Sequence, residues 1–486
     1  MRPSLNLLTG ETVQRIIDEG FALLENPGIE LHNQEGRELL LAAGAEADLD
    51  SLIVRIPEKI ARDALESCPN SFALHNLRGD PVVQYGSKGI YFNPGSSALT
   101  ILDRETQRAR EAKTEDFIHF VKLVEMLPQI DAQSTALVCS DVTEEIKDLY
   151  RLYLALIYMS KPIVTGAFRI DTWQIMKDLL VTAAGGLTNL QKKPLAIFDV
   201  CPSPPLKWSN QTYQNLIDCA RFDIPLQIVS IPMAGATSPV TLAGAVVQHT
   251  AECLSGITIS QLAGEGARVV WGGSPAVFDM KNSTTPMGAV GTLMIDVAYT
   301  QVGQTLQLPT QAYLGISDSK VVDAQCGLET SAGTILAALA GVNMISGAGM
   351  MAFENCQSFE KLVIDADIAG MAKLLSRGIQ IRDDPIALDL IREVGHQSEF
   401  IIHDHTHRWF KDEFYYPSPI IDRQTAEEWE RNGALTSWDR AKDQVNKLVA
   451  GYGEPTLDQS TRDEIRQITT LAAQNFGMAK LPTLPG

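Results

Sequence analysis

Residues 195–230, LAIFDVCPSPPLKWSNQTYQNLIDCARFDIPLQIVS, show most clearly how this chain alternates between strand and helix. A short apolar run (195–200) is followed by an amphipathic segment with helical spacing (209–221) and then by a second apolar run (226–230). Short runs rich in β-branched and aromatic residues are typical of buried strands. A strand, a helix and a second strand in this order predict two parallel strands joined by a crossover helix.

The same unit recurs from residue 90 onward, and it occurs eight times. The predicted strands are 90–93, 134–139, 162–168, 195–200, 226–230, 268–271, 311–315 and 343–347. The predicted helices are 115–127, 143–159, 171–184, 209–221, 238–264, 288–306, 327–341 and 358–378. Eight such units predict an α/β protein with a closed (β/α)8 TIM barrel, whereas an open doubly wound sheet usually needs fewer units.

The segments on either side of the repeats are mainly helical. Apolar residues at helical spacing predict helices at 11–24, 33–43 and 57–67, and alternation at 72–89 predicts a short hairpin. We therefore expect three parts: residues 1–89 as a cap of helices and hairpin, 90–380 as the barrel, and 381–486 as a helical extension packed on it.

Composition excludes several classes of function. The chain of 486 residues has 40 Lys and Arg against 59 Asp and Glu, a formal net charge of −19, which disfavours nucleic acid as a partner. Uninterrupted apolar runs stay short of the roughly 18 residues that a membrane-spanning helix needs, and the N-terminus lacks the order of a secretory signal. The 7 cysteines show no CxxC spacing, so we expect reduced thiols and a cytoplasmic protein.

In a barrel of this kind, the functional site lies at the carboxyl ends of the strands. Aromatic rings and carboxylates recur there, and a quaternary ammonium ion is attracted to both. The alternative is that the rings only fill the core. The candidate rings are Tyr91, Phe92, Phe198, Trp271, Tyr313 and Phe353, and the nearby carboxylates are Asp199, Asp279, Asp318 and Glu354.

The loop after the seventh predicted strand is the most polar of the strand-end loops. Its candidate binding residues are Ser317, Asp318, Lys320, Gln325 and Glu329, the last two being four apart and so on one face of the following helix. The alternative is a structural helix cap, in which Asp323 or Ser319 binds free backbone N–H groups.

Three histidines, His403, His405 and His407, suggest a metal site and hence a metal-dependent barrel hydrolase. They lie beyond the eighth unit, however, and an HxH pair at an early strand end is absent, so we predict no metal. The sequence also lacks a GxxxxGK[ST] phosphate loop and a GxSxG nucleophile elbow, so nucleotide and acyl-enzyme chemistry are unsupported.

Several blocks of the sequence, taken together, resemble the trimethylamine methyltransferase superfamily, and the similarity runs from about residue 10 to about residue 460. The founding trimethylamine enzymes contain pyrrolysine, whereas this chain has only the twenty standard residues, so it is similar to the non-pyrrolysine branch. The blocks are 102–114 (LDRETQRAREAKT), Lys161-Pro162, 271–280 (WGGSPAVFDM), 315–329 (GISDSKVVDAQCGLE), 337–349 (AALAGVNMISGAG) and the tail around Trp429, Arg440 and Ala441.

This resemblance implies a (β/α)8 enzyme that moves a methyl group from a quaternary amine to Co(I) of a separate corrinoid protein. Relatives in that branch use glycine betaine, proline betaine, carnitine or γ-butyrobetaine. The sequence has no DxHxxG motif, so we expect no cofactor bound by this chain and cobalamin supplied by the partner. We also expect a homo-oligomer.

The residues of the predicted substrate site come from the strand-end list, and none of them is singled out as catalytic. Asn93, Ser317, Lys281 and Lys320 are candidates for contacting a substrate carboxylate. A non-catalytic betaine-binding protein remains an alternative to the enzyme.

Overall fold

Parallel strands form the centre of the molecule, which the computed structural model describes for residues 3–47, 51–95, 97–396, 399–453 and 457–484. Each predicted apolar run overlaps one of these strands, although β9 shares only Ser134 with its run and β15 extends two residues beyond its run. They are β6 (Tyr91–Asn93), β9 (Gln133–Ser134), β10 (Ile163–Thr165), β11 (Ala196–Val200), β13 (Leu226–Ser230), β15 (Val269–Gly273), β17 (Gln311–Ala312) and β18 (Met344–Ser346).

These strands pair in parallel in two sheets, ordered β15-β13-β11-β10-β9 and β17-β18-β6. Hydrogen bonds also join the sheets at both edges. Trp271 and Thr310 form a parallel bridge between β15 and the start of β17. At the other edge, the backbone N–H groups of Asp131 and Ala132 donate to the Phe92 carbonyl at 2.9 and 3.1 Å.

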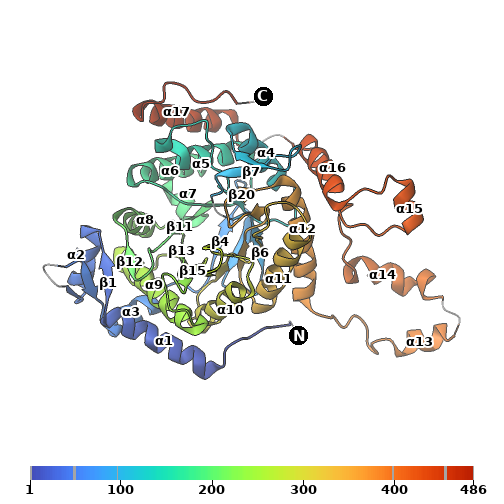
Figure 1. Cartoon of the computed structure of the whole chain (residues 1–486), viewed down its shortest axis with the longest axis horizontal. Coiled ribbons are helices and arrows are strands. Elements are labelled where there is room, and N and C mark those ends of the chain that lie inside the picture. The colour runs from blue at the N-terminus through green and yellow to red at the C-terminus, as the bar shows by residue number, and fades with distance from the viewer. Residues whose placement is uncertain (1–2, 48–50, 96, 397–398, 454–456, 485–486) are drawn as a thin grey trace.

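A helix follows each strand, and Figure 1 shows these helices arranged around the strands. The α/β class and the predicted alternation of strand and helix are confirmed. The helices are α4 (Thr114–Glu125), α5 (Lys147–Tyr158, after the 3-10 turn Glu144–Ile146), α6 (Ile170–Ala183) with the short α7 (Leu187–Lys192), α8 (Asn210–Arg221), α9 (Leu242–Ala263), α10 (Val290–Thr305), α11 (Ala324–Ala340) and α12 (Phe359–Arg377).

Successive side chains of these strands point to opposite faces, and both faces are buried. On β11, Phe198 packs against Trp173 of α6, with ring centroids 6.1 Å apart, whereas Ile197 belongs to an inner cluster with Val164 and Met344. The hairpin β4 (Phe72–His75) and β5 (Pro81–Tyr85) joins that inner cluster. The end where the strands begin is therefore filled with apolar side chains.

The N-terminal region covers α8 and α9. Helices α1 (Gly10–Glu25) and α3 (Glu58–Ser67) pack on α9, and α2 (Gln34–Ala42) contacts both α8 and α9. A small sheet in this region was not predicted, because its strands of two or three residues are too short to show a period. Its strands are β1 (Ile29–Leu31), β2 (Glu46–Ala47), β3 (Ile53–Arg55) and β12 (Lys207–Trp208).

Short strands also occur in the loops beyond the carboxyl ends of the central strands. The pair β14 (Met233–Ala234) and β16 (Ala276–Val277) is parallel. A four-stranded sheet contains β19 (Met350–Met351), β20 (Cys356–Gln357), β7 (Thr100–Leu102) and β8 (Ala109–Glu111), in that order. These pairings give the strand-end loops a fixed geometry.

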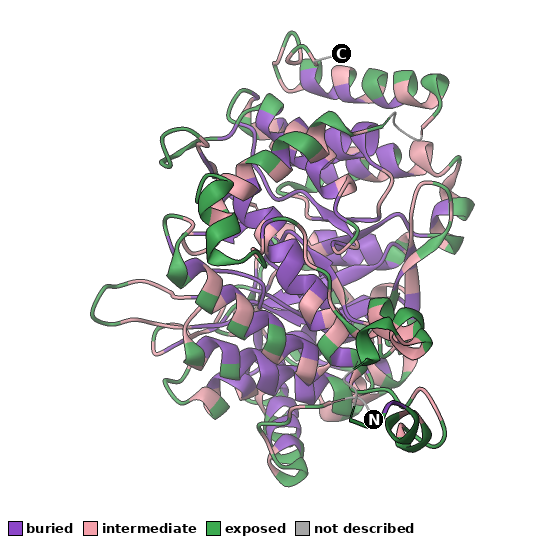
Figure 2. Ribbon diagram, turned by 90° about the vertical axis from the view of Figure 1, so that its right-hand side faces the viewer, coloured by how far each residue is buried: buried purple, intermediate pink, exposed green. Residues whose placement is uncertain are grey.

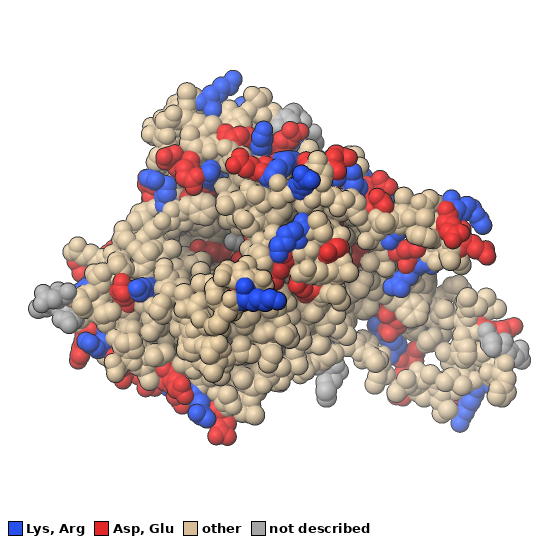
Figure 3. Space-filling model, viewed as in Figure 1, with Lys and Arg blue, Asp and Glu red and all other residues tan. Residues whose placement is uncertain are grey.

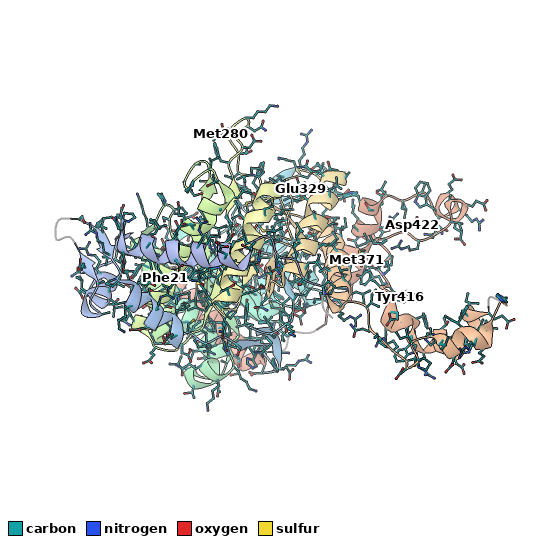
Figure 4. All side chains as sticks on the ribbon, turned by 90° about the horizontal axis from the view of Figure 1, so that it is seen from below. Phe21, Met280, Glu329, Met371, Tyr416 and Asp422 are labelled. Atoms are coloured by element: carbon teal, nitrogen blue, oxygen red, sulfur yellow. The ribbon has the colours of Figure 1, made fainter. Side chains whose placement is uncertain are left out.

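The C-terminal region divides into a packed and a projecting part. Helix α16 (Ser437–Ala450) packs on α12 and α4, and α17 (Gln459–Asn475) packs on α5 and α6. The helices of residues 379–396 and 399–431, which we call the projecting arm, stand away from the body in Figures 1 and 4, and Tyr415 and Ser418 attach the arm to Asp367 of α12 by hydrogen bonds. The arm contains α13 (Leu388–Val394), the 3-10 turn Phe400–Ile402, α14 (Asp404–Glu413) and α15 (Ala426–Arg431).

Burial follows the same division. Figure 2 shows buried residues in the centre of the body and exposed residues on its outer helices. Along the projecting arm, in contrast, large apolar side chains are exposed, with Ile379 at 94% and Ile401 at 78%. No helix in the described part of the chain combines the length and apolar character needed to cross a membrane.

Candidate functional site

A cavity of about 310 Å³ lies at the carboxyl ends of the central strands. Figure 3 shows a hollow in the surface on the same side, with carboxylate residues inside it. A larger hollow of about 590 Å³ opens instead where the strands begin, near Gly86 and Asn343. We take the strand-end cavity as the candidate site because ligand sites of parallel α/β proteins form at that end. It is lined by Gly95, Ser97, Thr135, Val164, Thr165, Gly166, Ala167, Phe168, Asp199, Val200, Cys201, Gln211, Thr212, Asn215, Val229, Ile231, Ser274, Tyr313 and Glu354.

Asp199, on β11, points into this cavity. Its carboxylate accepts a hydrogen bond of 2.9 Å from the Gln227 side chain on β13. Burial and the nearby charge of Glu354 raise the pKa of Asp199 to about 8, against the effect of hydrogen bonds from Gln227 and Tyr313. The group therefore exchanges a proton near neutral pH, and a cation bound beside it would favour the charged form.

Glu354 reaches the cavity from the turn between β19 and β20. The turn contains three successive non-glycine residues in the left-handed region, Ala352, Phe353 and Glu354, with φ of 50°, 60° and 63°. Such a run is sterically costly and is kept only where the surroundings hold it. Here the β19–β20 pairing and a hydrogen bond from Ala352 N to Ser319 O hold the turn.

The Glu354 carboxylate has few partners of its own. The contact with the Ser274 hydroxyl is long, at 3.5 Å. Burial raises the pKa of Glu354 to about 7, and the charge of Asp318 adds to this effect. Thus two carboxylates with raised pKa values line one cavity.

The cavity lining contains no Lys, Arg or His side chain among the described residues. Two aromatic rings, Phe168 and Tyr313, complete it. Carboxylates and aromatic faces in a partly closed space attract a cation, and an ammonium ion over such a ring gains about 2 kcal/mol when desolvated. The arrangement suits a small cationic ligand.

Of the predicted site residues, Asp199 and Tyr313 line the cavity and the other predicted rings do not. Phe198 faces α6, as described above. Phe92 also faces the helices, with Lys373 of α12 lying 5.5 Å from its ring centroid. Trp271 donates its indole N–H to the Tyr299 carbonyl on α10 at 3.0 Å. These three rings fill the layer between strands and helices.

Tyr91 and Asn93 lie on the inner face of β6 but outside the cavity lining. Tyr91 packs near the hairpin cluster, at the end where the strands begin. Asn93 is buried, and its side-chain oxygen accepts a hydrogen bond of 2.9 Å from Gly95 N.

The polar loop after β17 satisfies most of its own hydrogen-bonding groups. Glu329 accepts from the Ser317 hydroxyl at 2.7 Å and from Asp318 N at 2.8 Å. Gln325 also donates to Glu329, at 2.9 Å. Asp318 in turn accepts from Met287 N and Gly288 N at 2.9 and 2.8 Å.

Lys320 and Phe353 pair with each other near this loop. The Lys320 ammonium lies 4.1 Å from the Phe353 ring centroid and donates to the Asp318 carbonyl at 2.7 Å. Asp279 and Lys281 lie in a separate turn, in which Lys281 N donates to Asp279. None of these four side chains lines the cavity.

Several lining residues were not predicted as site residues. Ser97 and Thr135 follow β6 and β9, and Phe168 follows β10, at the end of a run that was taken only as a strand. Glu354 was noted among the rim carboxylates but not placed in the site. The rule that strand ends form the site would have found these residues if it had been applied to every strand. It was applied mainly to the strands that are followed by aromatic residues.

The histidines of the projecting arm do not form a cluster. His405 lies 3.3 Å from Asp383, and His403 lies 3.6 Å from Glu393. Across the described ranges, no group of three or more His, Cys, Asp or Glu side chains is placed to hold a metal ion. The geometry gives no support to the hydrolase alternative.

The parallel strands and the cavity at their carboxyl ends define an α/β protein with a small-molecule site. The chain belongs to the trimethylamine methyltransferase (MTTB) family, whose model matches residues 1–476. This confirms the resemblance inferred from the sequence blocks, and it makes the chain a member of a family of methyltransferases.

Curated relatives cover nearly the whole chain. A trimethylamine methyltransferase of Methanosarcina thermophila is 32% identical over 469 residues, covering 93% of this chain and 95% of that protein. A second, from Desulfitobacterium hafniense, is 29% identical over 458 residues, covering 94% and 92%. A glycine betaine methyltransferase of Desulfitobacterium hafniense is 28% identical over 458 residues, covering 94% and 95%.

A solved structure supports the fold. The monomethylamine methyltransferase of Methanosarcina barkeri superposes with a TM-score of 0.54 and 13% identity, over 91% of this chain and 87% of that one.

Proposed function

We propose that this protein transfers a methyl group from a betaine-type quaternary amine to Co(I) of a separate corrinoid protein. The observation that carries the proposal is the strand-end cavity, which combines Asp199, Glu354 and two aromatic rings and has no cationic side chain in its described lining. The similarity to a glycine betaine methyltransferase over 94% of the chain supports the substrate class.

The cavity residues suit the demands of this reaction. When the N–CH3 bond breaks, its electron pair stays on nitrogen, and a quaternary ammonium ion leaves as a neutral tertiary amine. No proton has to be supplied, so the site needs no general acid. The Co(I) centre supplies the nucleophile, and the task of this chain is to hold one methyl group in line with it while excluding water.

Asp199 and Glu354 stabilise the positive charge of the bound substrate. Part of that charge is still present in the transition state, where the N–CH3 bond is only partly broken, so the two carboxylates support kcat/KM as well as binding. The rings of Phe168 and Tyr313, which line the cavity, hold the methyl groups of the substrate in a fixed orientation.

We also propose that the central strands close into a (β/α)8 barrel spanning residues 90–380, with 1–89 as a cap and 381–486 as an extension. The bridge between Trp271 and Thr310 and the bonds to the Phe92 carbonyl support closure, because they link both edges of the two sheets. The corrinoid partner would then dock over the carboxyl ends of the strands, where the cavity opens.

A methyl-transfer assay tests the function. The purified protein is mixed with its Co(I) corrinoid protein, or with free Co(I) cobalamin, and with glycine betaine, proline betaine, carnitine, γ-butyrobetaine or trimethylamine, and methylation of cobalt is followed by absorbance. We expect methylation from at least one quaternary amine. Binding of a betaine without any methyl transfer to a competent partner would favour the non-catalytic alternative.

The expected homo-oligomer is also a proposal, and the projecting arm supports it. The arm exposes large apolar side chains, including Ile379, Ile381, Ile401, Ile402 and Phe414. Apolar surface of this extent is normally covered by another protein surface, and we propose a second copy of this chain. Light scattering should show a dimer or larger assembly, and I379S/I401S should dissociate it, whereas L471S on α17 should not.

The compartment follows from the same proposal. The 7 cysteines form no disulfide. Free thiols and a Co(I) acceptor both need a reducing environment, so we propose the cytoplasm.

A further inference from the structure

Arg151, on α5, lies directly behind one wall of the strand-end cavity. The side chain is fully buried. Its guanidinium donates to the Ser97 hydroxyl at 2.8 Å and to the Thr135 carbonyl, and it stacks over the Phe168 ring with its carbon 4.5 Å from the centroid. Ser97, Thr135 and Phe168 all line the cavity.

The charge of Arg151 is not neutralised by an ion pair. Among the described residues, no carboxylate lies within 4.0 Å of the guanidinium, and its Nη2 atom is buried without a hydrogen-bond partner. Asp148 attracts it from a greater distance, but the Asp148 carboxylate already accepts from Leu149 N, Phe168 N and the Thr172 hydroxyl. Buried charges are normally paired, and here the counter-charge of Asp148 is shared with three other donors.

Arg151 stays charged at neutral pH. Burial lowers the pKa of Arg151 to about 10, which still leaves the group protonated. Because a guanidinium can only donate, the Ser97 oxygen is the acceptor in their hydrogen bond. The hydrogen of the Ser97 hydroxyl is then available for donation to a ligand.

The cavity therefore differs in charge from one side to the other. Ser97, Thr135 and Phe168 follow β6, β9 and β10, whereas Ser274 and Tyr313, beside the two carboxylates, follow β15 and β17. In the five-stranded sheet, β11 and β13 lie between β10 and β15, whereas in the other sheet only β18 lies between β17 and β6. Arg151 thus lies behind the wall that contains Ser97 and Phe168, whereas Glu354 contacts Ser274 and Asp199 contacts Gln227 of β13.

We propose that the Arg151 side of the cavity binds the carboxylate of a zwitterionic quaternary amine, through the Ser97 hydroxyl and the charge of Arg151, while its ammonium group lies toward Asp199 and Glu354. This inference rests on the proposed function and assigns the residues that would contact the anionic group of a betaine. Lys281 and Lys320, which the sequence suggested for that contact, lie outside the cavity lining.

The test compares ligands that differ only in that charge. Glycine betaine and carnitine are each paired with the corresponding primary amide, which has the same shape and no negative charge, and affinities are measured by calorimetry with the full chain. A charge-assisted hydrogen bond to a buried cation is worth about tenfold to a hundredfold in affinity. We expect the wild-type protein to prefer at least one carboxylate over its amide by that factor.

Three variants test whether the preference for the carboxylate depends on Arg151. Arg151→Met should abolish the preference for the carboxylate and leave affinity for the amide nearly unchanged. Arg268→Met is the matched control, because Arg268 pairs with Asp223 away from the cavity, and the preference should stay. Ser97→Ala removes the donor without a buried charge, should reduce the preference about fivefold, and decides the question if Arg151→Met does not fold.

The outcomes separate this inference from the proposed function. Equal affinity for carboxylate and amide in the wild type, or a preference that survives both Arg151→Met and Ser97→Ala, overturns the inference. Methylation of cobalt from an amine without a carboxylate would, in that case, leave the proposed function standing. A preference that both variants remove, without methyl transfer to a competent partner, would instead support the inference and overturn the proposed function.

Discussion

The cavity and the loop after β17 are both rich in carboxylates at strand ends, yet they differ in how those carboxylates are satisfied. In the loop, Glu329 accepts from three donors of its own segment, and Asp318 accepts from two backbone N–H groups. In the cavity, Glu354 has one long contact of 3.5 Å. A carboxylate whose lone pairs are already used by the chain is structural, whereas one held in a cavity with few donors is available to a ligand.

The largest expected effect is on catalysis, at Asp199. Asp199→Asn keeps the shape and the contact with Gln227 but removes the charge next to the substrate cation. We expect kcat/KM for methyl transfer to fall about a hundredfold, or about 2.7 kcal/mol. Stability should not fall, because a buried ionisable group is replaced by a neutral one. Glu329→Gln in the loop is the control, and a loss of the same size there would remove the distinction between the regions.

The next effect is on stability, at Asp318. Asp318→Ala leaves the N–H groups of Met287 and Gly288 without their acceptor in a buried position. The free energy of unfolding should fall by about 2 kcal/mol. Urea denaturation measures this, and Asp279→Ala, in an exposed turn, serves as the control. An unchanged midpoint for Asp318→Ala would show that the loop does not depend on this carboxylate.

The two raised pKa values make the cavity sensitive to pH. Binding of a cation needs ionised carboxylates, and the pKa values of Asp199 and Glu354 are raised to about 8 and about 7. Affinity for a quaternary amine should therefore rise about a hundredfold from pH 6.5 to pH 8.5, about 25-fold from Asp199 and about fourfold from Glu354. Calorimetry in buffers of different ionisation enthalpy should also show proton release on binding. The double variant D199N/E354Q should lose both effects.

Stability should change in the opposite direction over part of the same range. From about pH 4, where carboxyls of the unfolded chain ionise, up to the raised values in the cavity, the folded state keeps protons that the unfolded state has lost. The contribution of these groups to the free energy of unfolding therefore falls as pH rises through that window. Urea denaturation at several pH values measures this contribution. It should be absent in D199N/E354Q, whereas the loop variant Glu329→Gln should retain it.

The sequence was sufficient for the strands and helices of the centre but not for the direction of their side chains. The run 195–200 predicts β11, yet both faces of that strand are buried, one under α6 and one in the interior. An aromatic ring fits either face, so composition alone does not show whether Phe198 or Asp199 faces the cavity. The period of two does, because adjacent residues on a strand must face opposite ways.

Other parts of the site depend on contacts between distant segments. Glu354 is placed by three left-handed residues, none of them glycine, so the sequence carries no turn signal there. Arg151 lies in a segment that correctly predicts a helix, but its contact with Ser97 joins residues 54 positions apart. The projecting arm also depends on long-range contacts. Local spacing predicts its helices, but their position away from the body depends on how few contacts they make with it.

The smallest expected effect comes from Gln325, a predicted site residue that is exposed on α11. Its side chain donates to Glu329 one helical turn away, and such pairs contribute about 0.5 kcal/mol or less on an exposed helix face. Gln325→Ala should lower the free energy of unfolding by no more than that amount and leave kcat/KM unchanged. A tenfold loss of activity would instead show that the loop contacts the substrate. Because Glu329 keeps its bonds from Ser317 and Asp318, this variant separates the outer surface of the loop from its buried network.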